Sequence, residues 1–332
     1  AGIDLAIKDI NDAGGVLGHQ VIMKLQKTLS LLTVAMTLIY IGLTINRVNW
    51  SAVQDIPTGT FQAFIGATIF GITGIGLGWV NSAADYSRYL PRTVKGSSVV
   101  FWTVLGASIV PITLVIYGSL LAGSDETLFG AIASDPIGAL TTLLPTWYLI
   151  PFALVAVLGL VGGAILDLYS SGLTLISIGI PVKRHIAASI DALIMLIGTI
   201  YIVWFASNFF IPFQGFLLTL GVPVAVWSAV FVTDVLIRKA PYIQEDLYRP
   251  DGAYGAWNKS SIFLLVIGSF IGWGFVSNSS ASWLSWQGYF LGVVGGREGT
   301  WASANIGVIL ALAVGSIGYL LLSLKKVRRQ ES

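Results

Sequence analysis

The sequence predicts an all-α polytopic membrane protein with about eight transmembrane helices, and two observations support this prediction. The first is the composition: 55% of the 332 residues are hydrophobic and only 10% are charged, whereas a soluble domain has about 25% charged residues. The second is that long uncharged stretches recur along the chain. Each is close to the ~20 residues that a helix needs to cross a bilayer.

The predicted spans follow one another from residue 29 onward. They cover residues 29–46, 61–82, 98–122, 148–179, 187–207, 209–237, 260–277 and 302–323. Lysine and arginine are concentrated in every second loop, and the loops between them hold only Arg47 and Arg297. Because basic loops stay on the cytoplasmic side, we expect both termini in the cytoplasm and the protein in a bacterial-type inner membrane.

The composition also excludes several classes of function. The chain has no cysteine and two histidines, so disulfides, thiolate metal sites and a histidine cluster are excluded. No P-loop, H-E-x-x-H or G-x-S-x-G pattern occurs, and no enzyme motif therefore competes with transport. The basic residues lie in loops between spans, so we expect no nucleic-acid partner. We also expect no metal and no cofactor.

The second span, residues 61–82, is the least regular. Its middle holds five glycines: Gly66, Gly71, Gly74, Gly76 and Gly78. An interior glycine costs a helix up to about 1 kcal/mol relative to alanine, so this helix is easy to break. Trp79 and Asn81 lie at the weak point. A broken span with such residues is how secondary transporters build a substrate site; the alternative is close packing of helices through small residues.

A resemblance to a known family bears on this choice. The sequence G-W-V-N-S-A-A-D-Y-S-R-Y-L-P, Gly78 to Pro91, resembles the end of the sixth span in the purine–cytosine permeases of the nucleobase:cation symporter family. A second sequence, D-L-Y-R-P-D-G-A-Y-G, Asp246 to Gly255, resembles the loop after their tenth span. The similarity covers roughly residues 27–325, which we expect to form the transmembrane permease domain. Residues 326–332 are expected to be a cytoplasmic tail.

The resemblance implies a LeuT-type fold, with two inverted five-helix repeats and two further helices. The chain would then hold spans five to twelve of a twelve-span protein. It would lack the first four, and we expect no transport by this chain alone. Trp79 falls where the subfamily stacks an aromatic ring on the base. The expected substrate-binding residues are Gly76, Gly78, Trp79, Asn81, Asp167 and Tyr169.

Asp167 lies inside the predicted span 148–179, sixteen residues before Lys183, or about 24 Å along a helix. A carboxylate at this depth is costly and is a functional candidate. Gly159 and Gly163 precede it at helical spacing, so we expect it to face packed protein or a wet cavity. The resemblance places it where the family has a base-binding Asn. A purely structural carboxylate is the alternative.

The coupling ion is expected to be a proton. Residues 152–166, just before Asp167, contain no Ser or Thr, whereas sodium-coupled relatives of this fold use hydroxyl groups in that region. Backbone carbonyls alone are a poor cage for a hard cation that prefers several oxygen ligands. Asp167 can instead take up and release a proton, as membrane carboxylates do in proton relays.

Residues 1–26 differ from the rest of the chain. We interpret them as a short amphipathic helix, an Ala-Gly-Gly turn and a strand-like run, a foreign or unstructured segment. They resemble the start of a periplasmic branched-chain amino-acid binding protein. The segment is either a misjoined gene start or an ordinary cytoplasmic tail.

Aromatic residues near span ends are expected to anchor the protein at the lipid headgroups. They are Trp147, Tyr148, Trp204, Trp257, Trp273, Trp283, Trp286 and Trp301. The segment 278–301 is expected to be an external loop with an interfacial helix, and the acidic segment 123–147 another external loop. Asp85, Asp191 and Asp234 are expected to form salt bridges at span ends.

The sequence therefore predicts cation-coupled uptake of a nucleobase such as cytosine or a purine. A same-fold transporter of allantoin, thiamine or an amino acid is one alternative, and a non-transporting remnant is another.

Overall fold

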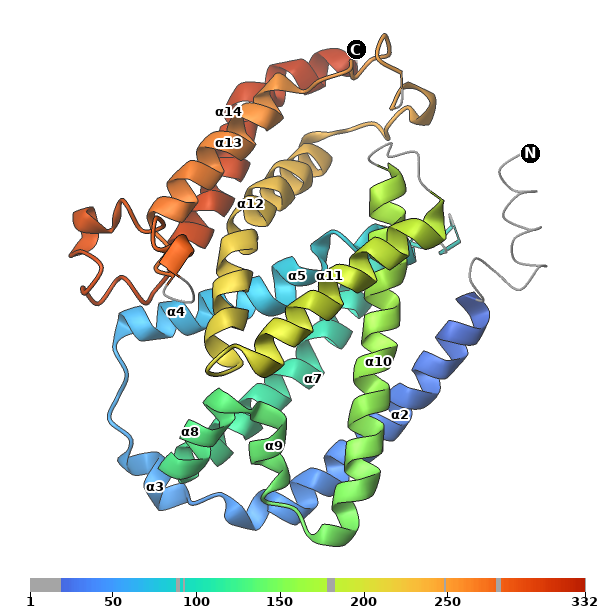
Figure 1. Cartoon of the computed structure of the whole chain (residues 1–332). Coiled ribbons are helices and arrows are strands. Elements are labelled where there is room, and N and C mark those ends of the chain that lie inside the picture. Colours follow the sequence, from blue (N-terminus) through green and yellow to red (C-terminus); the bar gives the residue numbers. More distant parts are fainter. Residues whose placement is uncertain are drawn as a thin grey trace. The chain divides into compact units, whose positions relative to one another are not determined.

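A computed structural model describes residues 19–87, 90–91, 93–177, 183–247, 249–278 and 282–331. Every regular element in these ranges is a helix (Figure 1). The chain divides into two compact units. Unit 1 comprises residues 1–56 and 108–207, and unit 2 comprises residues 57–107 and 208–332.

Unit 1 contains the helices of the first, fourth and fifth predicted spans. Its elements are α2 (His19–Thr44), η1 (Ile45–Arg47), α3 (Trp50–Asp55), α8 (Glu126–Ser134), α9 (Pro136–Thr141), α10 (Thr146–Ser177) and α11 (Arg184–Trp204). The long helix α7 (Gly96–Ser124) begins in unit 2 and continues into unit 1.

Unit 2 contains the glycine-rich span and the C-terminal helices. Its elements are α4 (Phe61–Gly71), η2 (Ile72–Leu77), α5 (Gly78–Val80), α6 (Ala83–Ser87), α12 (Phe210–Ile237), η3 (Gln244–Asp246), α13 (Lys259–Gly274), η4 (Ser282–Leu284), η5 (Leu291–Val294) and α14 (Gly307–Gln330).

Within the described residues, seven helices are long and apolar enough to cross a membrane. They correspond to seven of the eight predicted spans. The remaining predicted span, residues 260–277, is the apolar helix α13, which has 16 residues. At 1.5 Å per residue it is about 24 Å long, shorter than a bilayer core of about 30 Å. The class of all-α polytopic membrane protein is confirmed.

The core of unit 1 is rich in tyrosine. Tyr40, Tyr117 and Tyr148 are all buried there with apolar residues of α7 to α10. The Tyr117 and Thr44 hydroxyls are 2.5 Å apart, and the Tyr148 hydroxyl donates to the Met36 carbonyl at 2.5 Å. The prediction that Tyr148 anchors the protein in lipid headgroups is therefore wrong: its side chain is 1% exposed.

Helices α12, α13 and α14 pack against one another in unit 2, and glycines allow their backbones to approach closely. A Cβ on Gly307 of α14 would lie 1.9 Å from the Gly272 carbonyl oxygen of α13. A Cβ on Gly315 would lie 2.7 Å from the Ala229 Cβ of α12. Small residues at helix contacts are typical of membrane proteins, where close packing replaces the hydrophobic effect between helices.

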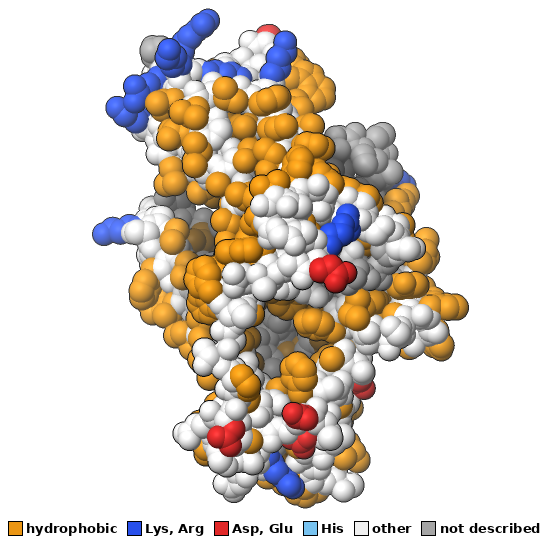
Figure 2. All heavy atoms as spheres, turned by 90° about the vertical axis from the view of Figure 1, so that its left-hand side faces the viewer, with side chains coloured by type: hydrophobic (Ala, Val, Ile, Leu, Met, Phe, Trp, Pro, Cys, Tyr) orange, Lys and Arg blue, Asp and Glu red, His pale blue; other side chains and the backbone are white. Residues whose placement is uncertain are grey.

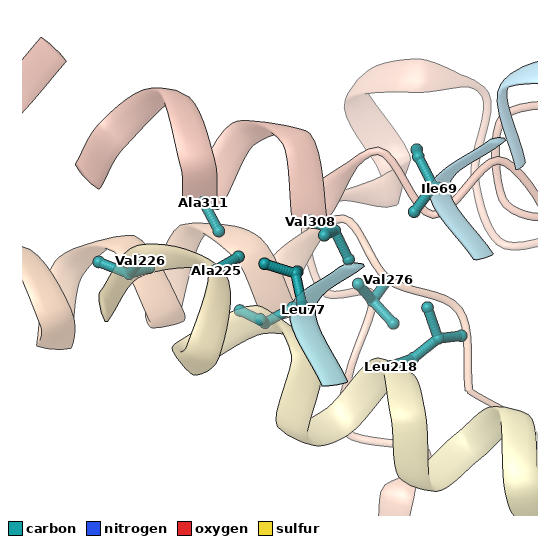
Figure 3. Close-up of a cluster of buried hydrophobic side chains, with 9 residues drawn as sticks. Ile69, Leu77, Leu218, Ala225, Val226, Val276, Val308 and Ala311 are labelled. Atoms are coloured by element: carbon teal, nitrogen blue, oxygen red, sulfur yellow. The ribbon is translucent and has the colours of Figure 1, made fainter. Parts of the chain in front are cut away.

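The glycine-rich span completes this core. Ile69 of α4 and Leu77 of η2 point toward Leu218 of α12 and Val308 of α14 (Figure 3). Val276, just after α13, belongs to the same cluster (Figure 3). Helix α4 begins at Phe61 because the Thr60 hydroxyl accepts the Ala63 N–H at 3.2 Å, which caps the helix.

Three local predictions are corrected by the structure. Residues 19–26, part of the predicted strand-like run, form the first two turns of α2. A short apolar run does not distinguish strand from helix. Residues 1–18 lie outside the described residues. The acidic segment 123–147 contains α8 and α9, because the Asp125 and Asp135 carboxylates cap their first turns.

The third correction concerns the segment 278–301. Its described residues, 278 and 282–301, contain the single turns η4 and η5 in place of an interfacial α-helix. Gly288, Gly295 and Gly296 have φ values of 78°, 104° and 83°. Such positive values interrupt a right-handed helix and are open to glycine at no steric cost.

Candidate functional site

The helix that carries the candidate site widens where its glycines gather. It is α-helical over Phe61–Gly71, π-helical over Ile72–Leu77 and α-helical again over Gly78–Val80. A turn at Asn81 and Ser82 then leads to α6. The sequence predicts a break here, whereas the structure shows a wider helical turn. π-Helical turns are rare and occur frequently at functional sites.

One face of this helix is buried against α12. Ile69, Thr73 and Leu77, spaced by four residues, are 0%, 2% and 7% exposed. The Thr73 hydroxyl donates to the Ile69 carbonyl at 2.6 Å. A Cβ on Gly221 of α12 would lie 2.3 Å from the Thr73 methyl group. The π-helical turn is thus held by a contact that requires glycine on the facing helix.

The exposed surface of this helix and of the turn after it, which we call the open face, carries the predicted binding residues. Gly76, Gly78 and Asn81 are exposed, and the Trp79 side chain is 51% exposed. A Cβ on Gly76 would meet no atom within 4 Å. Main-chain groups and an aromatic ring therefore lie together on an accessible surface, an arrangement that can bind a flat polar molecule.

The two interpretations of the glycines apply to different residues. Gly66 packs closely, because a Cβ there would lie 2.7 Å from the Ser303 carbonyl oxygen. Gly74 faces Leu217 of α12, with 3.5 Å between its ideal Cβ and the Leu217 Cδ1. Gly71 and Gly76 have no such neighbour within 4 Å. Helix packing explains the first pair and leaves the second pair available for another role.

Asp167 and Tyr169 lie on α10 in unit 1. Asp167 is exposed, whereas Tyr169 and Ser170 are each 5% exposed. Of the two glycines expected to share a packed face with Asp167, only one has a close neighbour. Gly159 faces the Thr33 hydroxyl oxygen of α2 at 3.7 Å, while Gly163 has no neighbour within 4 Å. The Asp167 carboxylate is therefore accessible and is not packed in the interior of unit 1.

The predicted site residues thus form two groups in two units. Unit 2 brings Gly76, Gly78, Trp79 and Asn81 together at the end of the widened helix, and α10 carries Asp167 and Tyr169 in unit 1. A common site formed by the two groups stays a prediction.

The sequence did not single out a polar cluster around Thr219 of α12. The Thr219 hydroxyl accepts from the Asn278 amide at 3.0 Å and from the Gln287 amide at 3.1 Å. The Trp273 indole N–H donates to the Thr219 carbonyl at 2.9 Å. Trp273 was predicted as a headgroup anchor, but its indole N–H bonds to the protein. The sequence alone does not show this cluster, because its residues come from three segments of the chain that meet only in the folded protein: α12, the end of α13 with the residues after it, and the loop at Gln287.

The second family-like sequence, Asp246 to Gly255, lies in the loop between α12 and α13. That loop is held to the helix ends by a charged cluster that we call the Asp234 cluster, which comprises Asp234, Arg238, Tyr242, Tyr254, Tyr319 and Gln330. The predicted salt bridge of Asp234 is confirmed: its carboxylate accepts from Arg238 at 2.8 Å. It also accepts the Tyr319 hydroxyl at 2.6 Å and the Tyr242 hydroxyl.

The Arg238 guanidinium connects this cluster to the loop. It lies over the Tyr242 and Tyr254 rings, 4.6 and 5.3 Å from their centroids, which are cation–π distances. It also donates to the Gln330 side-chain oxygen at 3.1 Å. Burial, followed by the Asp234 carboxylate, raises the pKa of the Tyr242 hydroxyl above its ordinary value. Tyr242 therefore stays protonated and donates at neutral pH.

Comparison with known proteins decides the family. Residues 10–302 match the sequence model of the permeases for cytosine/purines, uracil, thiamine and allantoin. The chain belongs to this family. The chain is also 22% identical, over 329 residues, to YxlA of Bacillus subtilis (strain 168), which bears a provisional name as a purine-cytosine permease. That alignment covers 95% of the chain and 66% of the relative. No solved structure matches the chain.

Proposed function

We propose that this chain forms part of a permease that takes up a nucleobase such as cytosine or a purine, coupled to a cation. The observation that carries the proposal is the open face of the widened helix, where Trp79 is half exposed beside Gly76 and Gly78. A planar base can stack on the indole ring, and stacking on an aromatic ring contributes about 1–3 kcal/mol per base.

Each candidate residue has a distinct proposed role. Trp79 stacks on the base, and Asn81 supplies an amide that both donates and accepts hydrogen bonds. Gly76 and Gly78 leave room for the substrate to approach the backbone. Asp167 accepts from the polar edge of the base and carries the coupling proton, and Tyr169, two residues further along α10, is the remaining proposed binding residue. No resident cofactor is part of the proposal.

The proposed arrangement in space follows the LeuT-type fold of the family resemblance. In it, the helix from Phe61 to Val80 corresponds to the sixth span and α10 to the eighth. The membrane orientation is part of the same proposal, with both termini in the cytoplasm of a bacterial-type cell.

The charge distribution of unit 2 supports this orientation. Lysine and arginine side chains gather where α14 ends, next to a surface covered by hydrophobic side chains (Figure 2). The loop between α12 and α13 contributes Arg238, Lys239, Arg249 and Lys259 at the same end. Basic residues next to membrane spans are retained on the cytoplasmic side.

Ligand binding tests the proposal directly. A transport-competent protein that contains this chain is purified in lipid nanodiscs, and binding of radiolabelled cytosine, adenine, uracil, allantoin and thiamine is measured. We expect saturable binding of a nucleobase that an excess of the unlabelled base displaces. If only thiamine or allantoin binds saturably, that compound and not a nucleobase is the substrate. Permeases for both compounds belong to this family.

A further inference from the structure

The last turns of α14 have one face in the protein and one face outside it. Tyr319, Ser323 and Val327, spaced by four residues, are at most 2% exposed and pack inside unit 2. Leu321 and Leu322, between them in sequence, are 76% and 51% exposed. Within about one further turn, the exposed residues of this face are basic instead of apolar. They are Lys325, Lys326, Arg328 and Arg329.

Three of these basic residues, Lys325, Lys326 and Arg328, are not neutralised by nearby acids in the described part of the chain. Among the described residues, Lys325, Lys326 and Arg328 take part in no ion pair. The Asp234 carboxylate is engaged by Arg238. The Glu331 carboxylate accepts the Lys239 and Ala240 N–H groups at 2.7 and 3.0 Å, and these bonds lower the pKa of Glu331. Both acids are thus committed to other partners.

The start of α13 adds to the same end of unit 2. The Asn258 amide donates to the Tyr319 hydroxyl at 3.4 Å, which places the start of α13 beside α14. Its neighbours in sequence are Trp257, which is 74% exposed, and Lys259, which is also exposed. Exposed tryptophan and lysine are typical of the headgroup level of a membrane.

We propose that this end of α14 binds an anionic phospholipid, with the phosphate between the side chains of Lys325, Lys326 and Arg328 and an acyl chain against Leu321 and Leu322. Lys325 and Lys326 each follow one of these leucines by four residues, so each lies about one turn, roughly 6 Å, along the helix from an exposed leucine. A phospholipid has the same order of parts, a charged headgroup followed by apolar chains. A soluble anion would use only the charges.

The test uses the full chain, purified and reconstituted in nanodiscs that contain equal amounts of phosphatidylglycerol and phosphatidylcholine. The protein is re-extracted in mild detergent, and the lipid that stays bound is identified by native mass spectrometry. We expect phosphatidylglycerol in excess over phosphatidylcholine. The triple variant Lys325→Gln/Lys326→Gln/Arg328→Gln should lose this preference by about tenfold or more, because each basic residue near a membrane contributes about fivefold to binding of anionic lipid.

Two controls make the result specific. The double variant Arg47→Gln/Arg297→Gln removes basic residues from the other loops and should retain phosphatidylglycerol as the wild type does. Raising the ionic strength should release the lipid from wild-type protein, because exposed charges are screened; this measurement needs no variant to fold. Soluble glycerol phosphate should not displace the lipid, because it lacks acyl chains.

Equal retention of the two lipids by the wild type would overturn the proposal. So would an undiminished preference in the triple variant, or release of the lipid by glycerol phosphate, which would indicate a site for free phosphate.

Discussion

Trp79 occupies an unusual position for a tryptophan in a membrane helix. It follows the π-helical turn, its side chain is 51% exposed, and the exposed Gly78 precedes it. If the ring stacks on a base, Trp79→Ala should weaken substrate binding by about 1–3 kcal/mol. Trp79→Phe should lose less, because a smaller aromatic face remains. Equilibrium binding of labelled substrate to purified protein measures both.

Trp204 provides a matched control for this prediction. It ends α11 and is 70% exposed, so Trp204→Ala removes an exposed indole from another helix. We expect its affinity to equal that of the wild type. Normal affinity in both Trp79 variants would show that the ring has no part in binding.

Asp167 is predicted to carry the coupling proton. Asp167→Asn preserves the shape of the side chain but removes its titratable proton, so concentrative uptake driven by a pH gradient should be lost. Binding of the substrate should persist, because the amide can still accept a hydrogen bond. Uptake is compared with and without Na⁺ at fixed pH, and with and without a protonophore.

Two results would contradict proton coupling through Asp167. One is wild-type uptake that requires Na⁺ and resists the protonophore. The other is an Asp167→Asn variant that still concentrates substrate with the pH gradient.

The sequence identifies residues whose chemistry is unusual for their surroundings. Trp79 next to a group of glycines and Asp167 within an apolar span are conspicuous in the sequence alone. Thr73 and Gly221 are not, because an ordinary threonine and an ordinary glycine gain their importance only by contact between two helices. The same reason explains why the bonds between Thr219 and Gln287 were not predicted.

At the scale of elements, the π-helical turn depends on its packing against α12. An alanine at position 221 would place its Cβ 2.3 Å from the Thr73 methyl group. Overpacking of this kind costs about 1–3 kcal/mol, so Gly221→Ala should lower the thermal stability of the detergent-solubilised chain. Adding Thr73→Ser should restore it, because serine lacks the methyl group but keeps a hydroxyl for the Ile69 carbonyl.

Gly106→Ala in α7 is the control for this substitution, because its Cβ would meet no atom within 4 Å. Alanine favours helix over glycine by up to about 1 kcal/mol, so no loss of stability is expected there. Equal stability of Gly221→Ala and wild type would show that the contact with Thr73 is not tight.

The Asp234 cluster yields a second prediction at this scale. Asp234→Asn removes the charge that the buried Arg238 guanidinium faces, while Tyr319 keeps an acceptor. Hydrogen bonds to charged groups contribute about 1.5–3 kcal/mol, and we expect a loss of about 2 kcal/mol in the free energy of unfolding. Asp251→Asn, which breaks the exposed pair with Arg249, should cause no measurable loss.

Long helices were predicted well, because a long apolar stretch is enough to identify them. Short helices were predicted less well. Helices such as α10 and α12 are visible as long apolar stretches. Helix α8 was missed, because its start depends on the Asp125 carboxylate, which accepts the N–H groups of residues 127 and 128. Tyr148 was misassigned as a lipid anchor, because position near a span end does not reveal which way a side chain points.

At the scale of the whole molecule, composition alone settles the membrane class, since 10% charged residues cannot cover a soluble protein. The family match over residues 10–302 agrees with the two sequences from which the resemblance was drawn. That Trp79 and Asp167 contribute to one site stays a prediction, because neither composition nor periodicity brings the two residues together.

Uptake by living cells is the most direct test of the central claim. Cells that lack their own nucleobase permeases express a transport-competent protein that contains this chain, and radiolabelled cytosine, adenine, uracil, allantoin and thiamine are offered in turn. We predict that a nucleobase accumulates above background, that the protonophore abolishes the accumulation, and that Trp79→Ala reduces it. A transport-competent protein that contains this chain and accumulates thiamine or allantoin but no nucleobase would contradict the account.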